Sequence, residues 1–112
     1  MASQKDSIIT DIKKYIVLLH QNGIPVQKAV LFGSWTKGTV HSDSDVDVAL
    51  VSRVFSGDRF QDRRKIVPLR RTINNRIEPI PFTPQAFASG GILVDEILKH
   101  GEEIVAASTP EE

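Results

Sequence analysis

The stretch AVLFGSWTKGTVHSDSDVDVALV, residues 29–51, decides the fold because it joins two apolar runs through a glycine turn and a group of acids. The first run ends at Gly33, and the second, 46–51, is preceded by Asp45 and contains Asp47. Short apolar runs bounded by glycine and polar residues are typical of buried strands. We therefore expect a strand, a turn, a short helix or loop, and a second strand that opens with carboxylates.

Asp45 and Asp47 occupy alternate positions, so in an extended strand their side chains project from the same face. Val46 and Val48 then point to the opposite face, where a core would form. Two carboxylates this close repel by roughly 4 kcal/mol at an effective dielectric constant of about 20. A chain tolerates such a pair when a cation lies between them or when one takes up a proton. Because oxygen ligands and substrate phosphates suit Mg²⁺, the pair predicts a magnesium site.

The glycine turn predicts the phosphate-binding half of the same site. Gly33 lets the backbone approach a phosphate closely, and a helix that starts at Ser34 would direct free N–H groups toward it. Lys37, in the following loop, can meet a phosphate as a point charge or remain a solvated loop lysine. The sequence therefore places phosphates beside Gly33 and metal ions beside Asp45 and Asp47.

Other interpretations of the acidic stretch fit less well. An EF-hand calcium loop beginning at Asp43 would need glycine at its sixth position and glutamate at its twelfth, where this chain has Val48 and Val54. A P-loop would need a glycine followed by lysine and then serine or threonine. A polar turn capped by aspartates would suit an isolated acidic stretch, but the preceding Gly33-Ser34 favours the catalytic interpretation.

The compound motif resembles the signature of the DNA polymerase beta nucleotidyltransferase superfamily. The residues that carry it are Gly33-Ser34 with Gly38, then the run Ser44-Asp45-Val46-Asp47-Val48. Its spacing is similar to that of the minimal nucleotidyltransferases of prokaryotes, and the resemblance extends over nearly the whole chain. It implies an α/β fold: a small mixed β-sheet with helices packed on one face, as in the palm core of the polymerase.

The resemblance also implies a set of site residues. The catalytic and metal-binding carboxylates would be Asp45, Asp47 and a third acid on the strand after the second helix. Glu78 is the acid in that place, where the family most often has aspartate. The alternative for Glu78 is an exposed strand acid that pairs with an arginine. Two Mg²⁺ ions and a nucleoside triphosphate, ATP, are the implied cofactor and substrate. The implied nucleotide-binding residues are Gly33, Ser34, Lys37 and Ser44.

The implied reaction is the transfer of AMP from the triphosphate to a hydroxyl acceptor on a partner protein. Similar proteins form one half of a two-gene pair with an all-helical HEPN-domain protein, which this chain would modify as an antitoxin. Two alternatives stay open: a catalytically inactive nucleotide-binding or scaffold subunit, suggested by the glutamate at position 78, and an aminoglycoside nucleotidyltransferase. A chain this short leaves little surface to enclose a base and an acceptor, so a helical partner or a second copy of the chain is expected to complete the site.

Length and composition narrow the class of protein. With 112 residues and 40% hydrophobic content, the chain is expected to form one domain, 1–107, followed by a disordered tail, 108–112. Lys plus Arg and Asp plus Glu each number 14, and this zero net charge argues against general nucleic-acid binding. The sequence has no cysteine, no apolar signal segment at its start and no apolar run of membrane-spanning length. A cytoplasmic protein without membrane association is therefore expected.

The remaining elements follow from apolar periodicity. Apolar residues recur at helical spacing over 5–22 and 92–100, and the run 26–32 is typical of a buried first strand. The segment 76–82 is expected to be short or to lie at a sheet edge, because two of its residues are prolines and lack an amide hydrogen.

A basic stretch, 53–76, lies between the second strand and that segment, and its acids are Asp58 and Asp62. Pro68 is expected to kink or split the helix that its apolar stripe predicts. The basic face is either simply solvated or docks an acidic partner or a triphosphate. Trp35 is expected to be exposed, either as a surface anchor or at the border of the nucleotide or a partner.

Overall fold

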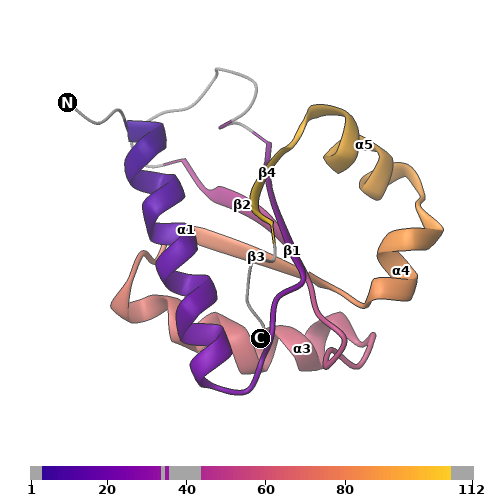
Figure 1. The fold of residues 1–112 in the computed structure, drawn as a ribbon, viewed down its shortest axis with the longest axis horizontal. Helices are drawn as coiled ribbons and strands as arrows, with labels where there is room; N and C mark the ends of the chain where they lie inside the picture. Colours follow the sequence, from indigo (N-terminus) through magenta and orange to yellow (C-terminus); the bar gives the residue numbers. More distant parts are fainter. Residues whose placement is uncertain (1–3, 34, 36–43, 107–112) are drawn as a thin grey trace.

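A four-stranded mixed sheet in the order β3-β2-β1-β4 forms the centre of the protein (Figure 1). The structure is a computed structural model and describes residues 4–33, 35 and 44–106. β1 pairs antiparallel with both β2 and β4, whereas β2 pairs parallel with β3. The strands span Lys28–Phe32 (β1), Val46–Val51 (β2), Ile77–Phe82 (β3) and Glu102–Ala106 (β4). The expected tail, 108–112, lies outside the described residues.

One face of the sheet is covered by α1, Gln4–Gln21, and by α3, Arg59–Ile66, which continues into the 3₁₀ helix η1, Val67–Thr72. The split between α3 and η1 confirms the expected effect of Pro68, which has no amide hydrogen for a continuing helix. Tyr15 of α1 joins this helix to α3, because its hydroxyl donates to the carbonyl oxygen of Ile66 at 2.6 Å. Apolar side chains of alternate strand positions complete this core: Ala29, Leu31, Val46, Val48, Leu50 and Ile77.

The opposite face carries a second, smaller layer made of α4, Pro84–Ser89, and α5, Ile92–His100 (Figure 1). The sequence predicted helices on one face; these two add cover on the other because the central strands are apolar in both phases of their alternation. Thr83 begins α4 by accepting a hydrogen bond from the amide of Ala86 at 3.0 Å. The buried residues of this layer are Val30, Ala49, Val51, Phe82, Phe87, Val94 and Ile97.

β3 forms one edge of the sheet, as its prolines predicted. The carbonyl oxygens of Arg76 and Phe82 accept from the amides of Val46 and Ser52, at 2.8 and 3.1 Å, so residues in this phase face β2. Pro79 lies in the other phase, as does Pro81, and both therefore turn their backbone nitrogen away from β2. The prolines consequently remove no hydrogen bond from the parallel ladder.

Trp35 is buried, with 5% of its surface exposed, and packs in the core on the α1 side of the sheet. The expectation that it is exposed is therefore wrong. Burial of its large apolar ring is favourable, and its place in a polar segment of the sequence concealed this. The guanidinium of Arg76 lies 5.9 Å from the centre of its ring. Within the described part of the chain, no helix is long and apolar enough to cross a membrane.

Candidate active site

The predicted aspartates lie where the chain enters β2. Asp45 is exposed and directly precedes the strand, and Asp47 is half-buried within it. Val46 and Val48 are fully buried on the α1 side, so alternation directs both carboxylates to the opposite face. The shared strand face expected from the sequence is therefore present in the structure.

Glu78 lies beside Asp47 on the neighbouring strand. The parallel register of β2 and β3 pairs these two residues directly, and the flanking Ile77 is buried on the α1 side. Glu78 thus projects from the same face as the aspartates, with 32% of its side chain exposed. Asp45, Asp47 and Glu78 form a group of three acids at one end of the sheet, which we call the carboxylate group.

The carboxylate group concentrates negative charge around Asp47. Burial raises the pKa of Asp47 above its usual range, and the charges of Asp45 and of Glu78 raise it further. All three causes act in the same direction, because each disfavours the ionised form of the central carboxyl. A divalent cation would relieve this repulsion, and a bound proton would relieve it in part.

Gly33 directly follows β1 and lies next to the carboxylate of Asp47. Phe32 pairs with Asp47 across the antiparallel strands, and Gly33 follows with a φ of 79°, in the left-handed region that favours glycine. A Cβ atom built at Gly33 would overlap Oδ2 of Asp47. This position therefore requires glycine for two reasons: its backbone conformation and the close approach of the Asp47 carboxylate.

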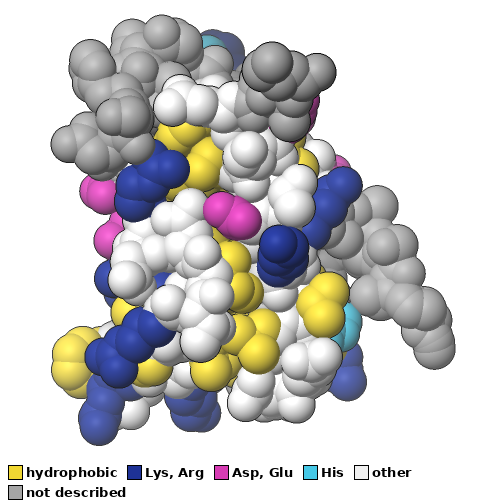
Figure 2. Space-filling view, turned by 90° about the vertical axis from the view of Figure 1, so that its left-hand side faces the viewer, with side chains coloured by type: hydrophobic (Ala, Val, Ile, Leu, Met, Phe, Trp, Pro, Cys, Tyr) yellow, Lys and Arg dark blue, Asp and Glu magenta, His cyan; other side chains and the backbone are white. Residues whose placement is uncertain are grey.

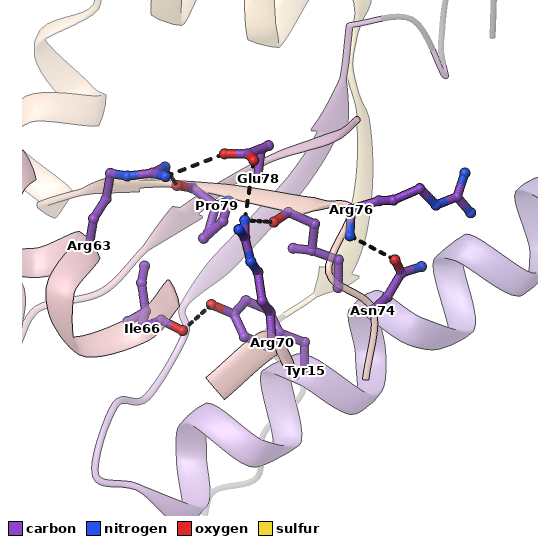
Figure 3. Close-up of polar contacts among 9 residues, drawn as sticks. Tyr15, Arg63, Ile66, Arg70, Asn74, Arg76, Glu78 and Pro79 are labelled. Carbon is purple, nitrogen blue, oxygen red and sulfur yellow. Dashed lines mark hydrogen bonds and ion pairs between the residues drawn. The ribbon is translucent and has the colours of Figure 1, made fainter. Parts of the chain in front are cut away.

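Two arginines hold Glu78 from the edge of the sheet (Figure 3). Arg63 of α3 donates to the carbonyl oxygen of Pro79 at 2.7 Å and to Oε1 of Glu78 at 3.3 Å. Arg70 of η1 donates to the carbonyl oxygen of Ile77 at 2.6 Å and to Oε2 of Glu78 at 3.2 Å. Each guanidinium therefore satisfies an outward carbonyl of β3 and one oxygen of the same carboxylate. We call this arrangement the arginine clamp.

The sequence left open that Glu78 pairs with an arginine, which the structure confirms, but it did not identify Arg63 and Arg70 as the partners, although one signal was present. Arg63 and Arg70 are seven residues apart, about two helical turns, so they lie on similar sides of a helical segment. What the sequence could not supply is that this side faces the edge of β3. The proline-rich strand leaves its outward carbonyls without a strand partner, and the arginines fill that role.

The carboxylate group suits a magnesium ion in its chemistry. Its donors are oxygens, and the charges of Asp45 and Glu78 add to burial in raising the pKa of Asp47. Among the described residues, no group of three or more His, Cys, Asp or Glu is already arranged to hold a metal ion. Both oxygens of Glu78 are engaged by arginines, yet each retains a further lone pair. Asp45 and Asp47 are therefore the ligands that fit directly, and the role of Glu78 stays a prediction.

The predicted nucleotide-binding residues are only partly described. Ser34 and Lys37 lie outside the described residues, as do Gly38 and Asp43. Ser44 is half-buried and directly precedes Asp45. Gly33 and the aspartates are thus brought together, which is the part of the predicted phosphate site that the described residues contain.

Known proteins share both sequence and fold with this chain. Residues 9–81 match a family model described as a nucleotidyltransferase domain. No curated protein matches the chain significantly. A solved toxin–antitoxin complex with AMP-PNP contains a similar chain: identity is 23%, 87% of this chain and 72% of that chain are covered, and the TM-score is 0.57. A chain of the toxin–antitoxin pair MntA-HepT is similar at 19% identity, with coverage of 86% and 70% and a TM-score of 0.52. At these identities the solved structures show a shared fold, which confirms the predicted mixed α/β sheet.

Proposed function

Because the chain belongs to the nucleotidyltransferase domain family, we propose that it transfers AMP from ATP to a hydroxyl group on a partner protein. The observation that carries the proposal is the carboxylate group beside the glycine turn, with Asp47 held against both Gly33 and Glu78. Similarity to a toxin–antitoxin chain crystallised with AMP-PNP supports an adenine nucleotide. Similarity to MntA-HepT supports an antitoxin that acts on a helical, HEPN-type toxin.

The transfer itself is a substitution at the α-phosphorus of the nucleotide. The acceptor oxygen forms a bond to this phosphorus, the bond to the bridging oxygen breaks, pyrophosphate leaves, and the hydroxyl proton passes to solvent. Two Mg²⁺ ions, held by Asp45, Asp47 and Glu78, would lower the pKa of the hydroxyl and stabilise the leaving pyrophosphate.

The residues of the chain have separate tasks in this scheme. The negative charge of Asp45 and Asp47 repels a triphosphate unless a cation is bound, so nucleotide binding should depend on Mg²⁺. The turn at Gly33 leaves the backbone free to approach the phosphates, with Ser34, Lys37 and Ser44 as further contacts. The arginine clamp limits the longer Glu78 side chain to one orientation, because both of its oxygens are bound.

A radiolabelled transfer assay tests this function. The chain is incubated with Mg²⁺ and ATP labelled at its α-phosphate, first alone and then with the helical protein encoded beside it. The proposal predicts label on that protein, and loss of label with the Asp45→Asn, Asp47→Asn double variant. Nucleotide binding without transfer to any acceptor would instead support the inactive scaffold, a reading that the engaged Glu78 also favours. Label on an added aminoglycoside would support the small-molecule alternative.

A further inference from the structure

α3 presents positive charge to solvent. Of its charged residues, Arg59, Arg64 and Lys65 are exposed and Arg63 is half-buried. Its acid, Asp62, is 2% exposed and accepts hydrogen bonds from the amides of Ser56 and Gly57, at distances of 2.9 to 3.2 Å. Within α3, all of whose residues are described, no exposed acid balances these cations, and the exposed Asp58 precedes the helix as its cap.

The same helix exposes an aromatic side chain. Phe60 is 69% exposed, which is unusual for a phenylalanine, and the guanidinium of Arg64 lies 5.9 Å from the centre of its ring. Phe60 and Arg64 line a groove of about 430 Å³, together with Arg63, Val67 and Pro68. We call this feature the α3 groove. Seen from the α1 side, Lys and Arg side chains gather beside exposed hydrophobic ones at the height of α3 and η1 (Figure 2).

Arg63 joins the α3 groove to the candidate active site. Arg63 lines the groove and also donates to Oε1 of Glu78 at 3.3 Å (Figure 3). Glu78 is in turn the direct neighbour of Asp47 on β2. A molecule seated in the groove therefore lies one side chain away from the carboxylate group, which is where an acceptor must be delivered.

We propose that the α3 groove docks the acceptor protein through an acidic segment that carries an exposed apolar side chain. The apolar side chain would contact Phe60, Val67 and Pro68, and a carboxylate beside it would pair with Arg64. Aromatic residues and arginine are the types most enriched among residues that dominate binding energy. The inference rests on the proposed function only in taking the docked protein to be the acceptor.

A nucleic acid fits this surface less well than a protein does. Nucleic-acid-binding domains usually carry a strong net positive charge, and this chain has a formal net charge of zero. The groove also includes Val67 and Pro68, which offer apolar contact and no hydrogen-bond donor in their side chains. An acidic, partly apolar protein segment matches both properties.

The test measures binding of the full chain to the helical protein encoded beside it, by calorimetry at 50 and 300 mM salt. Phe60→Ala and Arg64→Glu should each raise the dissociation constant at least tenfold, and the effect of Arg64→Glu should shrink at the higher salt concentration. Matched controls are Ile92→Ala, an apolar residue of α5 that is 92% exposed, and Lys14→Glu, an exposed cation of α1. Both controls should stay within twofold of the unchanged chain.

Binding of ATP with Mg²⁺, measured on the same variants, separates this inference from the proposed function. Phe60→Ala and Arg64→Glu should leave it within twofold, since neither residue touches the carboxylate group. A chain that docks its neighbour through the α3 groove but never transfers label would refute the proposed function alone.

Four results would overturn the docking site. The first is unchanged partner binding in both groove variants, and the second is a neighbouring protein that does not bind the unchanged chain at all. The third is that the two groove variants lose binding to a single-stranded RNA oligonucleotide but still bind the neighbouring protein. The fourth is a self-association of the chain that the two groove substitutions abolish, which would make a second copy the occupant.

Discussion

Asp47 and Glu78 are direct neighbours across the parallel pairing of β2 and β3, yet the two carboxylates lie in different electrostatic environments. Glu78 is paired with the guanidinium groups of Arg63 and Arg70. Asp47 has a raised pKa because it is partly buried and lies near the charges of Asp45 and Glu78. The negative charge that most needs a counter-ion is therefore on β2, at the position closest to the glycine turn.

Replacing Asp47 by asparagine should stabilise the metal-free protein at neutral pH. A carboxyl whose pKa is raised by folding favours the folded state below its ordinary pKa, and this contribution is lost as pH rises through the raised value. At pH 7 the charge therefore costs stability, and Asp47→Asn should raise both the free energy of unfolding and the Tm. Thermal unfolding between pH 3 and 8 measures this, and the gain should fade toward pH 3. Glu103→Gln, at an exposed acid of β4, is the control, and an equal gain there would refute the explanation.

Removing both aspartate charges should abolish the Mg²⁺ dependence of nucleotide binding. Asp45 and Asp47 share one face of β2 and provide the oxygen donors that fit the ion directly. In the double asparagine variant, calorimetry should show ATP affinity reduced at least about tenfold, a loss of roughly 1.4 kcal/mol. The protein should remain folded by circular dichroism. Undiminished binding of ATP with Mg²⁺ would place the nucleotide elsewhere.

Substitutions in the arginine clamp should separate the fold from the chemistry. Arg70→Gln removes donors to Ile77 and Glu78, and we expect a loss of about 1–3 kcal/mol of unfolding free energy. If Glu78 is the third metal ligand, Glu78→Gln should reduce transfer at least about a hundredfold, and Arg70→Gln should raise the Mg²⁺ concentration needed for half-maximal transfer. Transfer by Glu78→Gln within threefold of the unchanged chain would restrict Glu78 to a structural role.

Alanine at Gly33 should be more damaging than alanine at Gly23. Both glycines have positive φ, 79° and 82°, so both substitutions introduce backbone strain of about 1–2 kcal/mol. A Cβ at Gly33 also overlaps the carboxylate of Asp47, whereas a Cβ at Gly23 meets nothing within 4 Å. The difference in unfolding free energy between the two variants therefore measures the contact with Asp47. Gly33→Ala should in addition weaken nucleotide binding; equal effects on stability and binding at both positions would disprove the close approach.

Asp62 should be the more important of the two acids at the start of α3. Its buried carboxylate accepts from the amides of Ser56 and Gly57 and from the hydroxyl of Ser56, so Asp62→Ala leaves several polar groups unsatisfied and should cost about 3 kcal/mol. Asp58 caps α3 through the amides of Phe60 and Gln61, and Asp58→Ala should cost only about 1 kcal/mol. Urea denaturation of the two variants checks this order, which would be reversed if Asp62 were merely a surface charge.

Much of the fold could be predicted from the sequence because its signals were local. The alternation of acids and valines around Asp47 fixed which side chains face the core. Pro68 marked the end of α3, and the prolines of β3 marked an edge strand. The positions of Gly33, Asp45 and Asp47 in the candidate site followed from the same local patterns.

The rest depended on contacts between distant segments. The pairing of Asp47 with Glu78 needs the register of two strands separated by α3 and η1, which no local pattern contains. The burial of Trp35 and the layer that includes α4 depend on apolar surface left uncovered by other elements. The arginine clamp required knowing that η1 runs beside the outer edge of β3, where the carbonyl of Ile77 accepts from Arg70.

The arginine clamp and the prolines together close one edge of the sheet to foreign strands. The outward carbonyls of Ile77 and Pro79 are already bonded to arginines, and Pro79 offers no amide hydrogen. A strand from another molecule would find the carbonyls of Ile77 and Pro79 already bonded and no amide hydrogen at Pro79 or Pro81. Strand exchange or fibril growth through this sheet would therefore begin more readily at its opposite edge, β4, which makes β4 the segment to protect in concentrated solutions of the protein.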